Sequence, residues 1–210
     1  MLRLQLLKCS QCGAPIQAEG ADVVYYCTAC RSGYTLLTTE DGFEKEGLVP
    51  LEVSFVSAPN VAVGRYLPFW LLPATVTIRE RRASGGSIRG LLGKLTGQGA
   101  EGSGPSRGEG TFVIPAFDAA LAQTIALARR YTEAFPQLGE RLGERLVGGR
   151  LSARDAEKLA HFTLIAAEAE RPDTLQNLDY SIEFGQPRLL GVPFVDRGGR
   201  WVDALYGLPV

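Results

Sequence analysis

The chain has 210 residues, 45% of them hydrophobic and 21% charged, with 22 basic against 23 acidic side chains. This length fits one domain, or a small module joined to a moderate domain, and is ample for a buried core. A formal net charge of −1 excludes an overall basic nucleic-acid binder and an acidic disordered chain. The single histidine excludes a metal site built from several histidines.

The ends and the apolar stretches bear on where the protein acts. Residues 1–8 alternate leucines with other residues and are too interrupted for a signal peptide. The longest uncharged run, residues 66–78, has thirteen residues and contains two prolines. A membrane-spanning helix needs about 20 apolar residues. We therefore expect a cytoplasmic protein, in which paired cysteines serve as metal ligands more readily than as disulfides.

The four cysteines form two CxxC pairs, Cys9-Ser-Gln-Cys12 and Cys27-Thr-Ala-Cys30, separated by fourteen residues. Two intervening residues let both sulfurs of a pair turn inward on one tight loop, so the two pairs supply the four corners of a tetrahedron suited to zinc. Gly13 suits the turn after the first pair, because this position often needs a positive φ. Between the pairs, the sequence predicts a hairpin that turns near Gly20, and a strand over residues 34–39 follows.

This pattern resembles the zinc-ribbon family over residues 1–40. The resemblance implies a structural metal and a small three-stranded module. It departs in the second pair, where Arg31-Ser-Gly33 replaces an immediate glycine. Zinc ribbons serve in nucleic-acid binding, in protein docking and in plain stabilisation, so the module does not fix a function. The remainder of the chain resembles bacterial zinc-ribbon proteins of unassigned role, which implies no activity.

Two other uses of the four cysteines stay open beside structural zinc. A rubredoxin-like iron site would use the same ligands for electron transfer. A redox dithiol of thioredoxin type would need a CxxC that opens a helix after a strand, and neither pair has that context. Four thiolates leave no open coordination position for catalysis. We therefore predict one structural zinc ion.

Beyond a polar connector at residues 41–47, residues 48–210 have the pattern of an α+β domain with most strands in one antiparallel or mixed sheet and the helices on one face. Residues 61–78 read as extended segments broken near Gly64 and at Pro68 and Pro73. The other predicted strands cover residues 48–57, 75–79, 111–117, 178–184, 188–195 and 200–205, the last two joined by a turn at residues 196–199.

Residues 83–110 contain ten glycines among twenty-eight residues, which predicts a long flexible insertion, with one short helix around residues 88–95 as an option. Basic residues outnumber acidic ones from Arg79 to Gly110. A solvated insertion is the simpler interpretation, and a loop that grips phosphate or a partner is the alternative.

Three helices are predicted. Asp118 caps the first, whose inner stripe includes Leu121, Ile125, Ala128 and Tyr131; the second covers residues 136–146. Ser152 and Asp155 form an acidic capping box for the third, which runs to about Glu170. The helical wheel of this third helix turns five residues inward, namely Ala156, Leu159, Phe162, Thr163 and Ala166. It turns five others outward, namely Arg154, Glu157, Lys158, His161 and Glu168. His161 is thereby predicted to lie on the surface, away from any chemistry.

One weak pattern occurs three times. Residues 66–70, 113–117 and 191–194 each place a proline after a strand-forming residue, with an aromatic ring close by. The simpler interpretation is that each proline ends a strand and the ring fills the core. The alternative is a duplicated β unit that lines a shared groove. We predict a non-enzymatic adaptor or assembly subunit that docks a protein partner, and the residues expected to contact that partner are Tyr66, Phe69, Trp70, Arg79, Arg81 and Arg82.

Three other functions stay open. The ribbon could bind nucleic acid through Tyr25, Tyr26 and Tyr34, although a ribbon needs such rings for its own core. The aromatic and basic residues between Arg65 and Arg82 could associate with a membrane surface. A carboxylate site, such as one built from Asp179 and Glu183, would make the protein an enzyme, but no spacing favours it.

Overall fold

A strand-rich α+β fold is seen in the computed structural model, which describes residues 7–36, 48–84, 106–141, 145–170 and 174–210. A small antiparallel sheet contains β1 (Val24–Tyr26), β2 (Gly33–Leu36) and β3 (Leu48–Leu51) in that order. The strand predicted over residues 48–57 is therefore two strands, because it divides at Glu52 between this sheet and a larger one.

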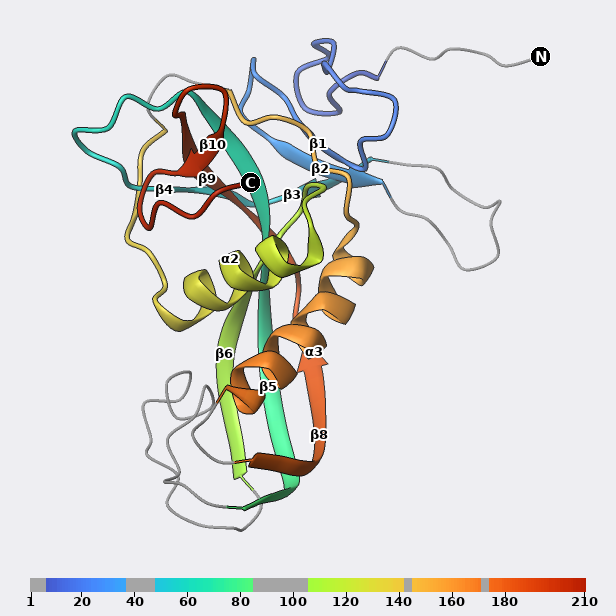
Figure 1. The fold of residues 1–210 in the computed structure, drawn as a ribbon. Helices are drawn as coiled ribbons and strands as arrows, with labels where there is room; N and C mark the ends of the chain where they lie inside the picture. Colours follow the sequence, from blue (N-terminus) through green and yellow to red (C-terminus); the bar gives the residue numbers. More distant parts are fainter. Residues whose placement is uncertain (1–6, 37–47, 85–105, 142–144, 171–173) are drawn as a thin grey trace.

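The larger sheet has seven strands in the described part of the chain. Its main order is β6-β5-β9-β4-β7, with β8 also paired to β5 and β10 to β9. The strands are β4 (Val53–Val56), β5 (Arg65–Ser84), β6 (Ser106–Pro115), β7 (Leu138–Gly139), β8 (Thr174–Phe184), β9 (Arg188–Asp196) and β10 (Trp201–Asp203). Only β4 and β9 pair in parallel, so the sheet is mixed, as predicted. Figure 1 shows β5, β6 and β8 as a long arm that leads away from the small sheet.

The predicted break near Gly64 is confirmed, since β5 begins at Arg65, but the breaks at Pro68 and Pro73 are wrong, because β5 runs through both prolines as one strand. In an antiparallel strand, the N–H and C=O of one residue point to the same neighbour. The carbonyl of Pro68 accepts from the Ala116 amide at 2.9 Å, just past the end of β6. That of Pro73 accepts from the Gly185 amide at 2.7 Å, between β8 and β9. The nitrogen of each proline, which carries no hydrogen, therefore faces a place where a neighbouring strand ends.

The ends of the predicted insertion at residues 83–110 are also strands. β5 continues to Ser84 and β6 begins at Ser106, and the two pair from Ile78↔Ser106 onward. The predicted helix near residues 88–95 lies outside the described residues. A register shift after Ile78 marks a β-bulge at Arg79. The bulge shifts the alternation of side chains along β5 by one residue, so Arg81 lies on the same face of the strand as Ile78. The helix predicted to begin after Ser152 covers this face.

Two helices pack on the large sheet, α2 (Leu121–Glu133) and α3 (Ala153–Ala169). Their faces differ from the predicted ones. In α2, Ala128 and Tyr131 are buried as predicted, but Leu121 is 61% exposed and the N-cap is Ala120 instead of Asp118.

The capping box that begins α3 is confirmed, since Ser152 Oγ accepts from the Asp155 amide at 3.2 Å. The inner face is rotated from the predicted one: Phe162 is 56% exposed, whereas Glu168 is fully buried. The cause is tertiary, because the small side chains of Ala156 and Ala160 let this side of the helix approach the sheet closely.

The helix predicted over residues 136–146 is wrong over its described part. Residues 138–139 instead form β7, which pairs with β4, and Leu146 makes an isolated bridge to Tyr66. Pairing with strands from elsewhere in the chain has overridden a helical pattern.

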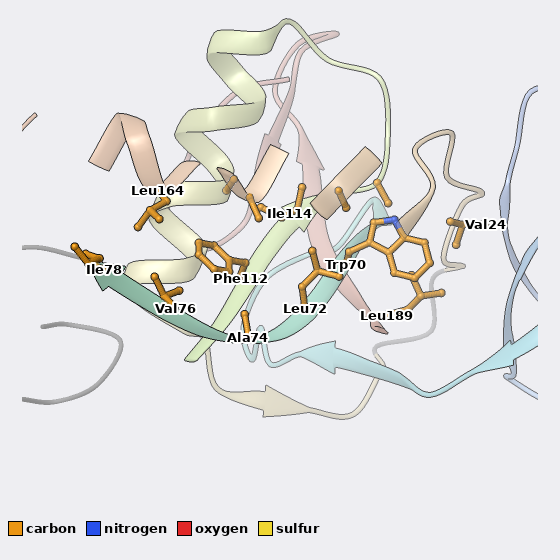
Figure 2. Close-up of a cluster of buried hydrophobic side chains, with 14 residues drawn as sticks. Val24, Trp70, Leu72, Ala74, Val76, Ile78, Phe112, Ile114, Leu164 and Leu189 are labelled. Atoms are coloured by element: carbon orange, nitrogen blue, oxygen red, sulfur yellow. The ribbon is translucent and has the colours of Figure 1, made fainter. Parts of the chain in front are cut away.

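The core lies on both faces of β5. Its even-numbered side chains from Trp70 to Ile78 form one cluster with Phe112, Ile114 and Leu164 (Figure 2). Its odd-numbered side chains from Leu67 to Leu71 form a second cluster, to which Leu127 and Tyr131 of α2 belong. Residues predicted to alternate on β8, namely Leu178, Tyr180, Ile182 and Phe184, do pack against the first cluster.

The small sheet is joined to the large one through β1. Val24 lies in the first core cluster, and its amide and carbonyl both bond to Gly149, at 3.0 Å each. The neighbouring Gly148 has no room for a side chain, since a Cβ there would lie 2.0 Å from Asp22 Oδ2. The two sheets therefore meet in close backbone contact.

Candidate metal centre

Both cysteine pairs lie on loops of the same shape. In the first, the Gly13 amide donates to the Cys9 carbonyl at 2.9 Å, and in the second, the Arg31 amide donates to the Cys27 carbonyl at 2.8 Å. Gly13 has φ +72° and Arg31 has φ +65°. Arg31 therefore takes the left-handed conformation that glycine takes in the first loop, and the departure from the zinc-ribbon pattern leaves the loop geometry intact.

The two loops bring the four sulfurs together. All four Sγ atoms lie within 4.8 Å of one another. Cys9 Sγ is 3.4 Å from Cys30 Sγ, and Cys12 Sγ is 3.6 Å from Cys27 Sγ. Zinc–sulfur bonds of about 2.3 Å in a tetrahedron place the sulfurs roughly 3.8 Å apart. The donor set and its spacing fit a zinc ion held by four thiolates.

A small apolar core supports this site. Ile16, Tyr25 and Tyr34 are buried together with Cys9 and Cys27. The Tyr34 hydroxyl lies 3.0 Å from Cys9 Sγ, where it can donate to a thiolate. Ser32 Oγ lies 3.3 Å from Cys30 Sγ. Because the rings of Tyr25 and Tyr34 are used in this core, they present no face on which a base could stack.

The same contacts shift the pKa values of two of the thiols in opposite directions. Burial acts to raise the pKa of Cys9, but hydrogen bonds led by the one to Tyr34 outweigh it and lower this pKa to about 6. For Cys12, the Ala14 amide lowers the pKa, while burial and the neighbouring cysteines raise it further, to about 12. A cation would replace these competing contacts by direct bonds to thiolates.

The aromatic residues predicted to contact a partner lie in the core. Tyr66, Phe69 and Trp70 have no exposed surface, and the Trp70 indole N–H donates to the Leu151 carbonyl at 2.9 Å. The prediction that they touch a partner is corrected, because a fully buried ring has nothing to offer to another molecule. The aromatic-proline segments supply side chains to this chain's own core.

The three predicted arginines all face carboxylates. Arg79 makes an exposed two-pronged pair with Asp179, at 3.0 and 2.7 Å, and Arg82 Nε lies 2.5 Å from Glu80 Oε1. Arg81 Nε lies 3.0 Å from Glu168 Oε2, and this pair is nearly shielded from solvent. Among the described residues, these three arginines pair with carboxylates of β5, β8 and α3, and not with the cysteine cluster.

Two further residues differ from expectation. His161 is half-buried, with Nδ1 3.1 Å from the Tyr180 hydroxyl, instead of facing outward. Asp203, which the sequence analysis did not single out, is 1% exposed and accepts from the Tyr131 hydroxyl at 2.8 Å. It also accepts from the backbone amides of Leu205, Tyr206 and Leu208. Burial, followed by the charge of Asp203, raises the pKa of Tyr131. Asp203 thus organises the C-terminal turn.

Comparison with protein-family models, with curated proteins and with solved structures finds no match for this chain. The zinc-ribbon resemblance thus rests on the cysteine spacing and on the clustering of the four sulfurs. Among the residues that the structure describes, neither helix is long and apolar enough to cross a membrane.

Proposed function

We propose that the chain binds one zinc ion through Cys9, Cys12, Cys27 and Cys30, and that this ion is structural. The observation that carries the proposal is the convergence of four sulfurs within 4.8 Å from two loops of matching geometry. Four protein thiolates complete the tetrahedral shell of zinc, so the metal has no position left for a substrate. Its role is then to hold the two loops together over a very small core.

Metal analysis of the purified protein tests this assignment. We expect about one zinc per chain, and much less after Cys12→Ser, which alters the most exposed ligand. Ser10→Ala, in the same loop, is the matched control and should keep the metal. Iron in place of zinc, or no metal in the unaltered chain, would contradict the proposal.

We further propose that the zinc-stabilised protein is a non-enzymatic adaptor that docks a protein partner through α3. Phe162 is 56% exposed and Ile165 is 41% exposed, and their spacing of three places both on one side of the helix. Large apolar side chains that neighbour one another on a surface are typical of protein contacts. This surface replaces the buried aromatic residues that the sequence alone suggested.

Affinity capture with paired variants tests the docking surface. The unaltered chain should retain a partner in stoichiometric amount, and Phe162→Ser with Ile165→Ser should lose it. Leu121→Ser, at an equally exposed leucine on α2, is the control and should retain the partner. Equal capture by all three proteins, or no stoichiometric partner at all, would contradict docking through α3. Binding of nucleic acid and association with a membrane stay predictions without a supporting contact.

A further inference from the structure

A second possible site lies at the junction of the ribbon and the α+β domain. A cavity of about 580 Å³ is lined on one side by ribbon residues, including Gln17, Glu19 and Tyr26, and on the other by residues of the larger domain, including Arg65, Arg145 and Trp201. Its volume is in the range of small-molecule sites, which often lie where two structural units meet.

Two residues that line this cavity each carry a buried polar atom with no hydrogen-bond partner within the described parts of the chain: Tyr26, in its hydroxyl, and Arg65, in its Nε. Tyr26 is 96% buried, since its exposed fraction is 4%. Leaving a buried donor without an acceptor costs stability, so such groups are normally satisfied. Here both residues line one cavity, so a ligand bound there would lie beside two residues that lack an acceptor.

Three arginines and three acidic residues line the wall, and two of the arginines lie where they could serve a negative acceptor. The Arg65 guanidinium stacks at 3.8 Å over the Trp201 ring, and Arg145 Nη1 donates to the neutral Gln17 Oε1 at 3.1 Å. Over the ranges described, neither arginine forms an ion pair within 4.0 Å.

The acidic groups on the wall are already engaged. Glu19 and Asp118 both bind Arg150, at 2.9 and 3.2 Å, and Asp22 Oδ2 accepts from the Glu19 amide at 2.8 Å. Arg65 and Arg145 therefore line the cavity with no carboxylate of the described residues within ion-pair distance, while Asp196 acts on Arg65 through its charge from farther away.

We propose that this cavity binds a small organic anion, with a carboxylate or phosphate group as the charged end. Tyr26, Arg65 and Arg145 would donate to that group, because hydroxyl and guanidinium N–H donors match its oxygens. Leu67 and Phe117, which also line the cavity, would contact the apolar part of the ligand. This site is separate from the zinc site, and its ligand would lie against both the ribbon and the α+β domain.

Calorimetric titration of the zinc-loaded full chain tests the site with two probes that share an aromatic ring, benzoate and phenyl phosphate. Benzyl alcohol, which carries no charge, is the control, and sodium chloride keeps the ionic strength constant. We expect saturable binding of at least one anion and none of the alcohol; the tighter anion identifies the charged group. If neither anion binds at concentrations up to about 10 mM, the proposal is overturned.

Variants separate binding from folding. Tyr26→Phe removes only the unpartnered hydroxyl, so it should weaken binding about tenfold without lowering the Tm. Arg145→Gln should weaken binding by a similar factor, whereas Arg188→Gln, a residue outside the cavity that faces Glu52 at 3.8 Å, should not. The adjacent Tyr25→Phe calibrates stability, because its hydroxyl donates to the Asp22 carbonyl at 2.5 Å and its loss should lower the Tm. Unchanged affinity in both Tyr26→Phe and Arg145→Gln would contradict the site.

Discussion

The ribbon and the α+β domain are stabilised in different ways. In the described residues, the buried cluster of the ribbon contains five residues, and two of these are cysteines of the metal site. The two main clusters of the α+β domain contain Trp70, Phe112, Phe69 and Phe194 among many aliphatic side chains. We expect a module of this size to bury too little apolar surface to offset its conformational entropy and to depend on the proposed zinc ion, whereas the larger sheet and its helices should not.

The largest expected effect is the loss of the metal. A strong chelator, or Cys27→Ser, should unfold the two cysteine loops, residues 9–13 and 27–31, while β1 and the large sheet stay folded, because zinc contributes about 10–16 kcal/mol of apparent binding free energy in small zinc modules. Hydrogen exchange measured along the chain would show the amides of these two loops deprotected. Fluorescence of the buried Trp70 should change little. Unfolding of both regions together would show that the large domain also depends on the metal.

Acid should produce the same selective loss. Zinc binds thiolates, and in the metal-free cluster the pKa of Cys9 is lowered to about 6 while that of Cys12 is raised to about 12. Protons therefore compete with zinc for the thiolates throughout the range, and more strongly as the pH falls. A titration from about pH 8 to pH 5, followed by metal release, should therefore show affinity falling with pH. The control is a sample titrated with excess zinc, in which release shifts to lower pH.

In the α+β domain, the largest single effect should come from Arg81. Arg81→Met removes the guanidinium that lies 3.0 Å from the fully buried Glu168 carboxylate, which should lower the free energy of unfolding by about 3–5 kcal/mol. Denaturant unfolding followed by Trp fluorescence measures it. Arg79→Met, whose pair with Asp179 is exposed, should have little effect, and equal losses would contradict the difference in burial.

The junction between the two regions should respond to Gly148→Ala. A Cβ at this position would lie 2.0 Å from Asp22 Oδ2, so the chain must shift, at a cost of about 1–3 kcal/mol. Thermal unfolding of the zinc-loaded protein measures the loss. Gly20→Ala is the control, because nothing lies within 4 Å of its Cβ position.

The smallest effect is expected inside the ribbon. Arg31→Gly removes the backbone strain of a non-glycine residue in the left-handed conformation, which should stabilise the fold. Glycine also gains conformational freedom in the unfolded chain, so the net stabilisation should be below about 1 kcal/mol. Gly13→Ala at the equivalent position should destabilise instead. The two variants are compared by the midpoint of their zinc-dependent unfolding. A stabilising effect of Gly13→Ala would contradict the matching geometry of the loops.

The metal site and the fold class could be predicted from sequence because both depend on short-range patterns. The CxxC spacing fixes which atoms of one loop can meet, and Ser152 with Asp155 fixes where α3 begins. Other features depend on distant neighbours. Residues 138–139 join a strand because β4 lies beside them, and Glu168 turns inward because a bulge at Arg79 directs Arg81 toward it.

The sequence by itself determined that the four cysteines converge, the α+β class and the hairpin turn at residues 196–199, in which Gly198 and Gly199 take positive φ. Local spacing and the conformational freedom of glycine are sufficient for these. Only the tertiary structure decided that Tyr66, Phe69 and Trp70 form core and that Tyr26 and Arg65 line a cavity. An aromatic ring next to a proline is equally suited to a core or to a surface. Packing against segments far away in the chain, such as Leu151 beside Trp70, selects between them.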